Sequence, residues 1–170
     1  MTTIEVTEQA RARLHELAVA RGEPDHVTVE KVLRDIRTIF LHAPREEFEF
    51  GMENDFVKAL EEEVAQYNML AIECIAHVIL EREAHPEVAS EALRWLGSID
   101  HPESRQLRLK LLETCLQDPS RWVRDGAALG LDVIGDRHAI PALKAAVAQE
   151  SIQELRKDLA SVLRRLEQMP

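Results

Sequence analysis

Few side chains in this sequence stand at spacings that could support chemistry, and the clearest pair is Cys74 with His77. On a helix, two residues three positions apart share one face, and Glu73 and Glu81 lie close by in the sequence. A structural zinc site needs four converging ligands, so a buried cysteine beside a half-exposed histidine explains the pair better. No serine stands in a pattern that indicates a Ser-His-Asp triad. We therefore expect no catalytic residue, no metal site and no cofactor, and we do not expect an enzyme.

The helices that carry these residues are best read from an internal repeat. Three segments that start at Val88, Val123 and Leu155 align without gaps, with starts 35 and 32 residues apart. Apolar residues recur in each copy at i, i+4, i+8 and i+11, which is one face of an α-helix. A second helix is expected between the copies, over Glu103–Leu116 and over Ala139–Ala148. Such helix pairs bury their apolar faces only by stacking on their neighbours, so the pattern predicts a short all-α solenoid of antiparallel pairs.

The middle of the repeat region carries the motif of a known family. Asp118 precedes Val123 and Arg124, an Ala-rich helix follows, and Gly135–Asp136 leads into the segment AIPAL. This pattern resembles the HEAT repeat, in the bacterial form related to phycobilisome-lyase repeats, over about residues 84–167. The resemblance implies a ladder between stacked repeats, built from an acidic residue six positions before an arginine. Asp118 with Arg124 and Glu150 with Arg156 have this spacing.

The remaining composition agrees with a single α-helical domain over residues 1–170. Of the 170 residues, 45% are hydrophobic and only 4% are aromatic, which is enough apolar content for a core and too little for a β-rich chain. We expect residues 1–52 to form an N-terminal helical cap and loop, and residues 53–170 to form the repeats. The cap helices are expected over residues 7–21 and 28–41. The repeat part should open with a helix from Asn54 and a second helix over Met69–Glu83.

The cysteines and the hydropathy of the chain bear on its compartment. Cys74 and Cys115 each lie among apolar residues of an expected helix, which predicts buried free thiols and a reducing environment. Neither a signal peptide nor a run of 18 apolar residues is found. We therefore expect a cytoplasmic protein without membrane contact.

The charge is uneven along the chain. Residues 1–100 contain 10 Lys and Arg against 21 Asp and Glu, whereas residues 101–170 contain 11 against 10. An acidic first half disfavours binding to a phosphate backbone, which rests on cationic contacts. Nucleic acid is therefore not expected as a partner. The acidic half fits either a basic protein surface or solubility alone.

One face of the helix that starts near Val123 differs from its two sister copies. An apolar stripe runs along this face and consists of Trp122, Gly126, Leu129 and Val133. The aligned positions in the other copies are polar, as solvent-facing positions should be. Tryptophan contributes disproportionately to interface energies, and a glycine lets another surface approach closely. The stripe therefore predicts a partner-binding patch on the inner face of the stack. Its centre is Trp122 and Leu129, and its polar rim is Arg94, Arg121, Asp125, Asp132 and Lys157.

Three occupants of this patch stay open at this point. Another protein can bind it, the N-terminal segment with Phe48 and Phe50 can fold back over it, or a second copy can form a homodimer through it. The function that these patterns favour is a non-enzymatic scaffold or adaptor that binds a protein through the inner face of the solenoid. The alternative, implied by the family resemblance, is an accessory of the phycobilin-lyase kind that handles a chromophore or another small ligand.

Overall fold

The computed structural model describes residues 26–43 and 55–169, and within these residues every regular element is a helix. The all-α prediction is therefore confirmed. The described helices divide into two compact units, α2 to α4 and α5 to α9. The helix expected over residues 7–21 and the segment with Phe48 and Phe50 lie outside the described residues. The expected organisation stays a prediction: a single domain in which residues 1–52 form the cap and loop and residues 53–170 form the repeats.

The first unit packs α2 (His26–His42) against α3 (Asp55–Tyr67) and α4 (Met69–Leu80). One apolar face of α2 recurs at helical spacing and is buried; it consists of Val29, Val32, Leu33, Ile36 and Phe40. Phe40 meets Phe56 of α3 edge-on, with ring centroids 5.2 Å apart. The helix expected from Asn54 and the helix expected from Met69 are separate, as predicted. Asn68 has a φ of 49°, which breaks the helical conformation between α3 and α4.

Helix α4 ends at Leu80, three residues before the predicted end at Glu83. Arg82 adopts a left-handed backbone conformation, with φ of 55°, and turns the chain away from the helix axis. The backbone N–H groups of Arg82 and Glu83 then donate to carbonyl groups of the last helical turn, which closes the helix. Because Glu81, Arg82 and Glu83 are charged residues of high helix propensity, the sequence did not reveal the early end.

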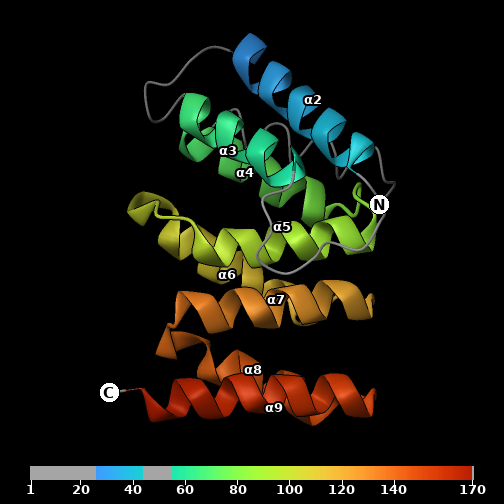
Figure 1. Cartoon of the computed structure of the whole chain (residues 1–170), viewed down its shortest axis with the longest axis vertical. Helices are drawn as coiled ribbons and strands as arrows, with labels where there is room; N and C mark the ends of the chain where they lie inside the picture. The colour runs from blue at the N-terminus through green and yellow to red at the C-terminus, as the bar shows by residue number, and fades with distance from the viewer. Residues whose placement is uncertain (1–25, 44–54, 170) are drawn as a thin grey trace. The chain divides into compact units, whose positions relative to one another are not determined.

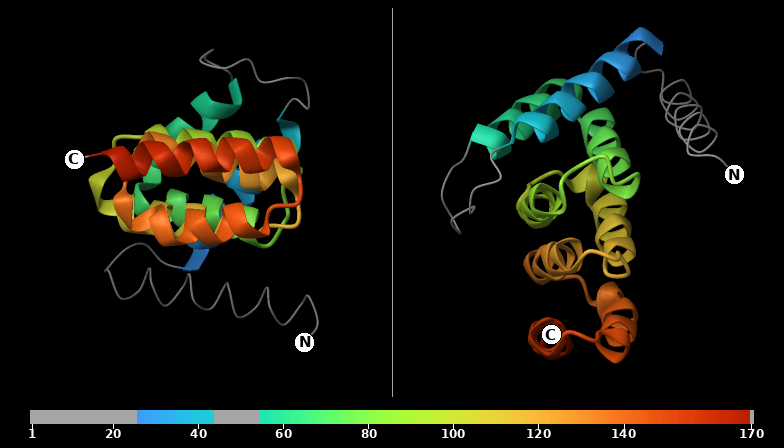
Figure 2. Two further views of the ribbon diagram at one scale, coloured as in Figure 1. Left: turned by 90° about the horizontal axis from the view of Figure 1, so that it is seen from below. Right: turned by 90° about the vertical axis from the view of Figure 1, so that its right-hand side faces the viewer.

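The second unit is a stack of helix pairs. Its α-helices are α5 (Pro86–Ser98), α6 (Arg105–Cys115), α7 (Arg121–Ile134), α8 (Ile140–Gln149) and α9 (Gln153–Gln168). Short 3-10 helices, η1 (Pro102–Ser104) and η2 (Arg137–Ala139), precede α6 and α8. Helices α5, α7 and α9 lie side by side in one layer, and α6 and α8 form the other layer (Figures 1 and 2).

The repeat register predicted from the sequence is confirmed by burial. The aligned residues Val88, Val123 and Leu155 are all buried, and so are the next aligned residues, Ala92, Ala127 and Leu159. Further along, Ile99 of the first copy and Leu163 of the last are only half-buried. Gly135 ends α7 with φ of 62°, a left-handed conformation that glycine adopts without steric cost, and its N–H donates to the carbonyl of Leu131. The second unit is therefore a short α-solenoid, and it fixes which faces of α5, α7 and α9 are left to solvent.

Candidate protein-binding surface

The apolar stripe of α7 is exposed at both of its ends. The side chain of Trp122 is 45% exposed and that of Val133 is 59% exposed, while Leu129 between them is half-buried. These residues follow each other at i, i+7 and i+11 and so share one face of the helix. At 1.5 Å per residue the stripe is about 16 Å long. We call the surface formed by these three side chains the Trp122 stripe.

Gly126 does not belong to this exposed surface, which corrects the expectation that it lets another surface approach. It is buried, and a Cβ atom added to it would lie 2.5 Å from the backbone oxygen of Ser90 in α5. A Cβ atom on Gly97 of α5 would lie 2.4 Å from the backbone oxygen of Gly130. The glycines therefore allow α5 and α7 to pack backbone against backbone.

Arg121 covers part of the tryptophan ring. The central carbon of its guanidinium lies 5.1 Å from the centroid of the Trp122 ring, at the distance of a cation–π contact. The side chain of Trp122 is nevertheless close to half exposed. An aromatic ring that carries an arginine on one side and is open elsewhere is a common anchor in protein interfaces.

Asp132, predicted as a rim residue, is bound within the stack. Arg165 of α9 donates two hydrogen bonds to its carboxylate, at 2.7 and 2.8 Å, and a third to Ser161 at 2.8 Å. The bond to Asp132 raises the pKa of Arg165. Sequence reasoning did not name Arg165 as a partner. The sequence feature that could have indicated this pair is the separation of 33 residues between Asp132 and Arg165, which is close to one repeat length.

Asp125 lies among charges of both signs. Burial raises the pKa of its carboxyl group, and the negative charge of Asp158 on α9 raises it further, while Arg94 of α5 and Arg121 lower it. Arg94 also lies 3.5 Å from Glu91 on its own helix. Four of the predicted rim residues, Arg94, Arg121, Asp125 and Asp132, are therefore part of a mixed-charge surface beside the Trp122 stripe.

The fifth predicted rim residue is not drawn into this surface. Lys157 is exposed on α9, one position before Asp158, and forms no hydrogen bond or ion pair with the described part of α7. Because successive helical residues point about 100° apart, Lys157 faces away from the seam where Asp158 and Arg165 meet α7. The structure therefore does not bring Lys157 to the Trp122 stripe.

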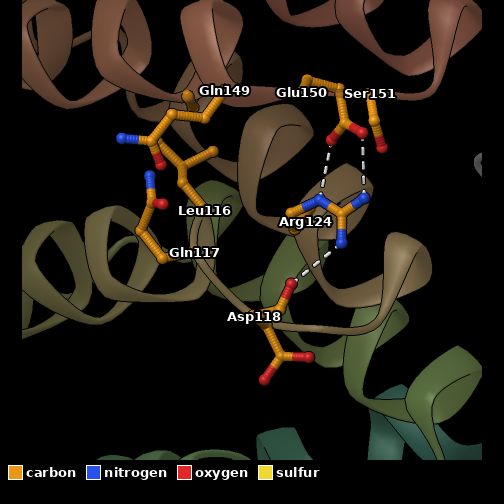
Figure 3. A pocket seen from close by; sticks show the side chains of 8 residues that line it. Leu116, Gln117, Asp118, Arg124, Gln149, Glu150 and Ser151 are labelled. Carbon is orange, nitrogen blue, oxygen red and sulfur yellow. Dashed lines mark hydrogen bonds and ion pairs between the residues drawn. The ribbon is translucent and has the colours of Figure 1, made fainter.

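The predicted ladder between repeats is present between Arg124 and Glu150 (Figure 3). The guanidinium of Arg124 donates to both carboxylate oxygens of Glu150, at 2.7 and 3.0 Å, and to the carbonyl of Asp118 at 2.9 Å. The side chain of Glu150 is 2% exposed, and it also accepts a hydrogen bond from the N–H of Ile152. The bonds from Arg124 lower the pKa of Glu150. Arg124 thus ties α7 to the turn that precedes α9.

A pocket of about 230 Å³ opens beside this ion pair. Besides the pair, Gln117, Gln149 and Ser151 line it, and Leu116 and Ala146 contribute apolar atoms (Figure 3). Its volume is below the range of roughly 300–1,000 Å³ that is usual for small-molecule sites, and the charged groups that line it are already paired. The pocket offers no apolar cavity for a chromophore.

The pair Cys74 and His77 lies in the first unit and does not form a reactive site. Both residues are buried, so His77 is less exposed than expected, and one of its ring nitrogens lies 3.8 Å from Glu83. Burial raises the pKa of the Cys74 thiol to about 12, which holds it in the unreactive protonated form. Cys74 and Cys115 are both buried free thiols, as predicted. Within residues 26–43 and 55–169, no group of three or more His, Cys, Asp or Glu could hold a metal ion.

Comparison with known protein families shows what the chain resembles. The family model for HEAT repeats matches residues 75–164, more than half of the chain. No curated protein and no solved structure shows a significant match. Over the described residues, no helix is both long and apolar enough to cross a membrane.

Proposed function

The chain belongs to the HEAT-repeat family, and we propose that it is a non-enzymatic scaffold or adaptor that binds another protein through the Trp122 stripe of α7. HEAT repeats commonly mediate protein–protein interactions, and the family generally consists of scaffolds rather than enzymes. The proposal concerns which surface is used and which residues form it.

The observation that carries this proposal is the exposure of Trp122 where the solenoid has no structural need for an apolar residue. The sister positions on α5 and α9 are Glu87 and Glu154, so a polar residue satisfies the same place in the stack. Trp122 and Val133 are among the large apolar side chains that the described residues leave exposed. Apolar side chains gathered on one exposed helix face, with a polar border, are typical of an interaction surface.

The mixed-charge surface beside the stripe would act as the rim. Arg121 keeps one side of the tryptophan ring covered, and Arg94 and Asp125 offer charges of both signs to an incoming chain. Such a rim contributes more to partner choice than to affinity. The apolar centre would supply most of the binding free energy, and truncation of Trp122 should cost about 2 kcal/mol or more, or at least roughly thirtyfold in Kd.

The test is affinity capture from native cell extract with three forms of the protein. These are the wild type, the double variant Trp122→Ala/Leu129→Ser, and the control Leu80→Ala. Leu80 is 47% exposed, close to the 45% of Trp122, but it lies on α4 in the first unit. We expect a protein that wild type and Leu80→Ala retain and that the folded double variant loses. Equal retention by all three forms would remove the Trp122 stripe as the binding surface.

A homodimer through the same stripe is distinguished by mass. The chain has a mass of 19.3 kDa, so light scattering after size exclusion separates monomer from dimer directly. A dimer that Trp122→Ala converts to monomer would assign the stripe to self-association in place of a foreign partner. Circular dichroism of each variant, compared with wild type, shows that a lost interaction does not come from a lost fold.

A further inference from the structure

The side of α9 that faces away from α7 repeats the residue pattern with which α7 packs against α9. Helix α7 presents three residues one turn apart toward α9: Arg124, Ala128 and Asp132. Arg124 binds Glu150 in the turn before α9, and Asp132 binds Arg165 near the end of α9. Ala128 lies between them and is buried. A cation, a small residue and an anion therefore form the side of α7 that stacks on α9.

The same three positions recur on α9, where none of the described helices packs against them. One repeat of 32 residues further on, the counterparts are Arg156, Ala160 and Arg164. Both arginines are exposed, and Ala160 is half-buried where Ala128 is fully buried. The family resemblance implies that Arg156 takes part in the ladder, but it forms no side-chain hydrogen bond or ion pair with the residues that the structure describes. Helix α9 lies at the edge of its layer (Figures 1 and 2).

The charge of this side is the reverse of that on α7. Where α7 presents Asp125 and Asp132, α9 presents Lys157 and Arg164. Glu167, a carboxylate near the end of the same side, is bound by Lys144 of α8 at 2.9 Å. The exposed charges that remain are therefore the cations Arg156, Lys157 and Arg164. Two copies of this surface would repel each other, which disfavours a symmetric dimer through α9.

We propose that this open side of α9 binds an acidic amphipathic helix of a partner protein, stacked on α9 as α9 is stacked on α7. Arg156 binds a carboxylate in the turn before the partner helix, as Arg124 binds Glu150. Arg164 binds a second carboxylate 15 residues further along, the separation of Glu150 and Arg165. Arginine suits both positions because its guanidinium donates two parallel hydrogen bonds to a carboxylate. This surface is separate from the Trp122 stripe and does not depend on it.

The chain supplies its own probe for this proposal. A labelled synthetic peptide of residues 149–168 with Arg165→Glu carries Glu150 and a second carboxylate at the required separation. Its new glutamate would be repelled by Asp132, so it cannot replace α9 in the stack. The control peptide keeps Arg165 and carries Glu150→Gln. We expect fluorescence anisotropy at low salt to show at least about tenfold tighter binding of the acidic peptide to the full chain, because it alone offers both carboxylates.

Variants of the full chain then test each contact. Arg156→Gln should weaken binding of the acidic peptide about tenfold, and Trp122→Ala should leave it unchanged. Arg164→Glu should reverse the preference at the second contact, so that a peptide with both Glu150 and Arg165 binds better than the acidic peptide. The proposal is overturned if the two original peptides bind alike, if neither binds, or if Arg156→Gln has no effect while circular dichroism shows an intact fold.

Discussion

The substitution Gly126→Ala tests the close approach of α5 and α7 on which the stack rests. The added Cβ atom would lie 2.5 Å from the backbone oxygen of Ser90 and 2.6 Å from its Cα atom, whereas ordinary contact begins at 3.4 Å. Backbone atoms cannot rotate away as a flexible side chain can. The two helices must therefore separate by about 0.9 Å at this point, and gaps of this size remove a quarter to a half of the local dispersion energy.

Two effects of opposite sign decide the stability of this variant. Alanine favours a helix interior over glycine by about 1 kcal/mol, and overpacking of a tight contact costs roughly 1–3 kcal/mol. Because the obstacle here is backbone, we take the upper part of that range and expect a net loss of about 1–2 kcal/mol. For a unit of this size the midpoint of thermal unfolding should fall by roughly 5–10 °C.

Tryptophan fluorescence is a suitable assay because it reports the second unit alone. The chain has 2 tryptophans, Trp95 in α5 and Trp122 in α7, and none in the first unit. The control is Val133→Ala, on the same helix but exposed, which should change stability by less than about 0.5 kcal/mol. A midpoint that is unchanged or raised in Gly126→Ala would refute the backbone contact between α5 and α7.

Two further predictions concern titratable groups. Hydrogen bonds from Arg124 hold the pKa of Glu150 below its ordinary 4.5, so the pair stabilises the fold above about pH 4.5 and this contribution is lost as the pH falls through the lowered value. Glu150→Gln should therefore lower the free energy of unfolding by about 2 kcal/mol at pH 7. The difference in thermal midpoint between this variant and wild type should become smaller in acid. A difference that does not depend on pH would contradict the ion pair. Burial raises the thiol pKa of both Cys74 and Cys115 to about 12. A thiol reagent at pH 8 should label neither until denaturant is added, and rapid labelling of the native protein would show that one thiol is accessible.

The repeat itself could be predicted from the sequence because its cause is local. Each copy must bury one helical face, so Val88, Val123 and Leu155 recur in register, and all three are buried. The ladder that contains Arg124 and Glu150 was implied by the family resemblance. The register of the repeat, in contrast, needed only the period of the helix and the length of the repeat.

The exposure of individual residues on the stripe could not be predicted from the repeat. On a helical wheel Gly126 lies beside Trp122 and Val133, so periodicity assigns all three to one exposed face. The structure separates them because α5 approaches so closely that it covers the edge of the stripe at Gly126. Interhelical distance depends on pairs of residues from two helices, such as Gly97 with Gly130, and a single-helix pattern does not contain it.

The same limit applies to the predicted rim. Asp132 was expected to face a partner, but Arg165 of α9 binds it at 2.7 Å. Lys157 was expected beside the stripe, but it is exposed on another side of α9. Charged side chains are long, and which partner each one meets is decided by the rotation of neighbouring helices about their axes. Sequence alone placed both residues on helices of the stack, but it did not show that Asp132 is already bound by Arg165 or that Lys157 lies away from the stripe.

Stability and binding can therefore be separated on α7 by two neighbouring positions. Gly126 faces α5 and should affect folding, whereas Trp122, four residues away, is 45% exposed and should affect binding. If Trp122→Ala lowered the unfolding midpoint as much as Gly126→Ala, the tryptophan would be part of the core, and the interaction surface would have to lie elsewhere. If Trp122→Ala leaves the midpoint near that of wild type, the stack does not need this residue. An exposed tryptophan without a role in folding is then best explained by a surface that another molecule covers.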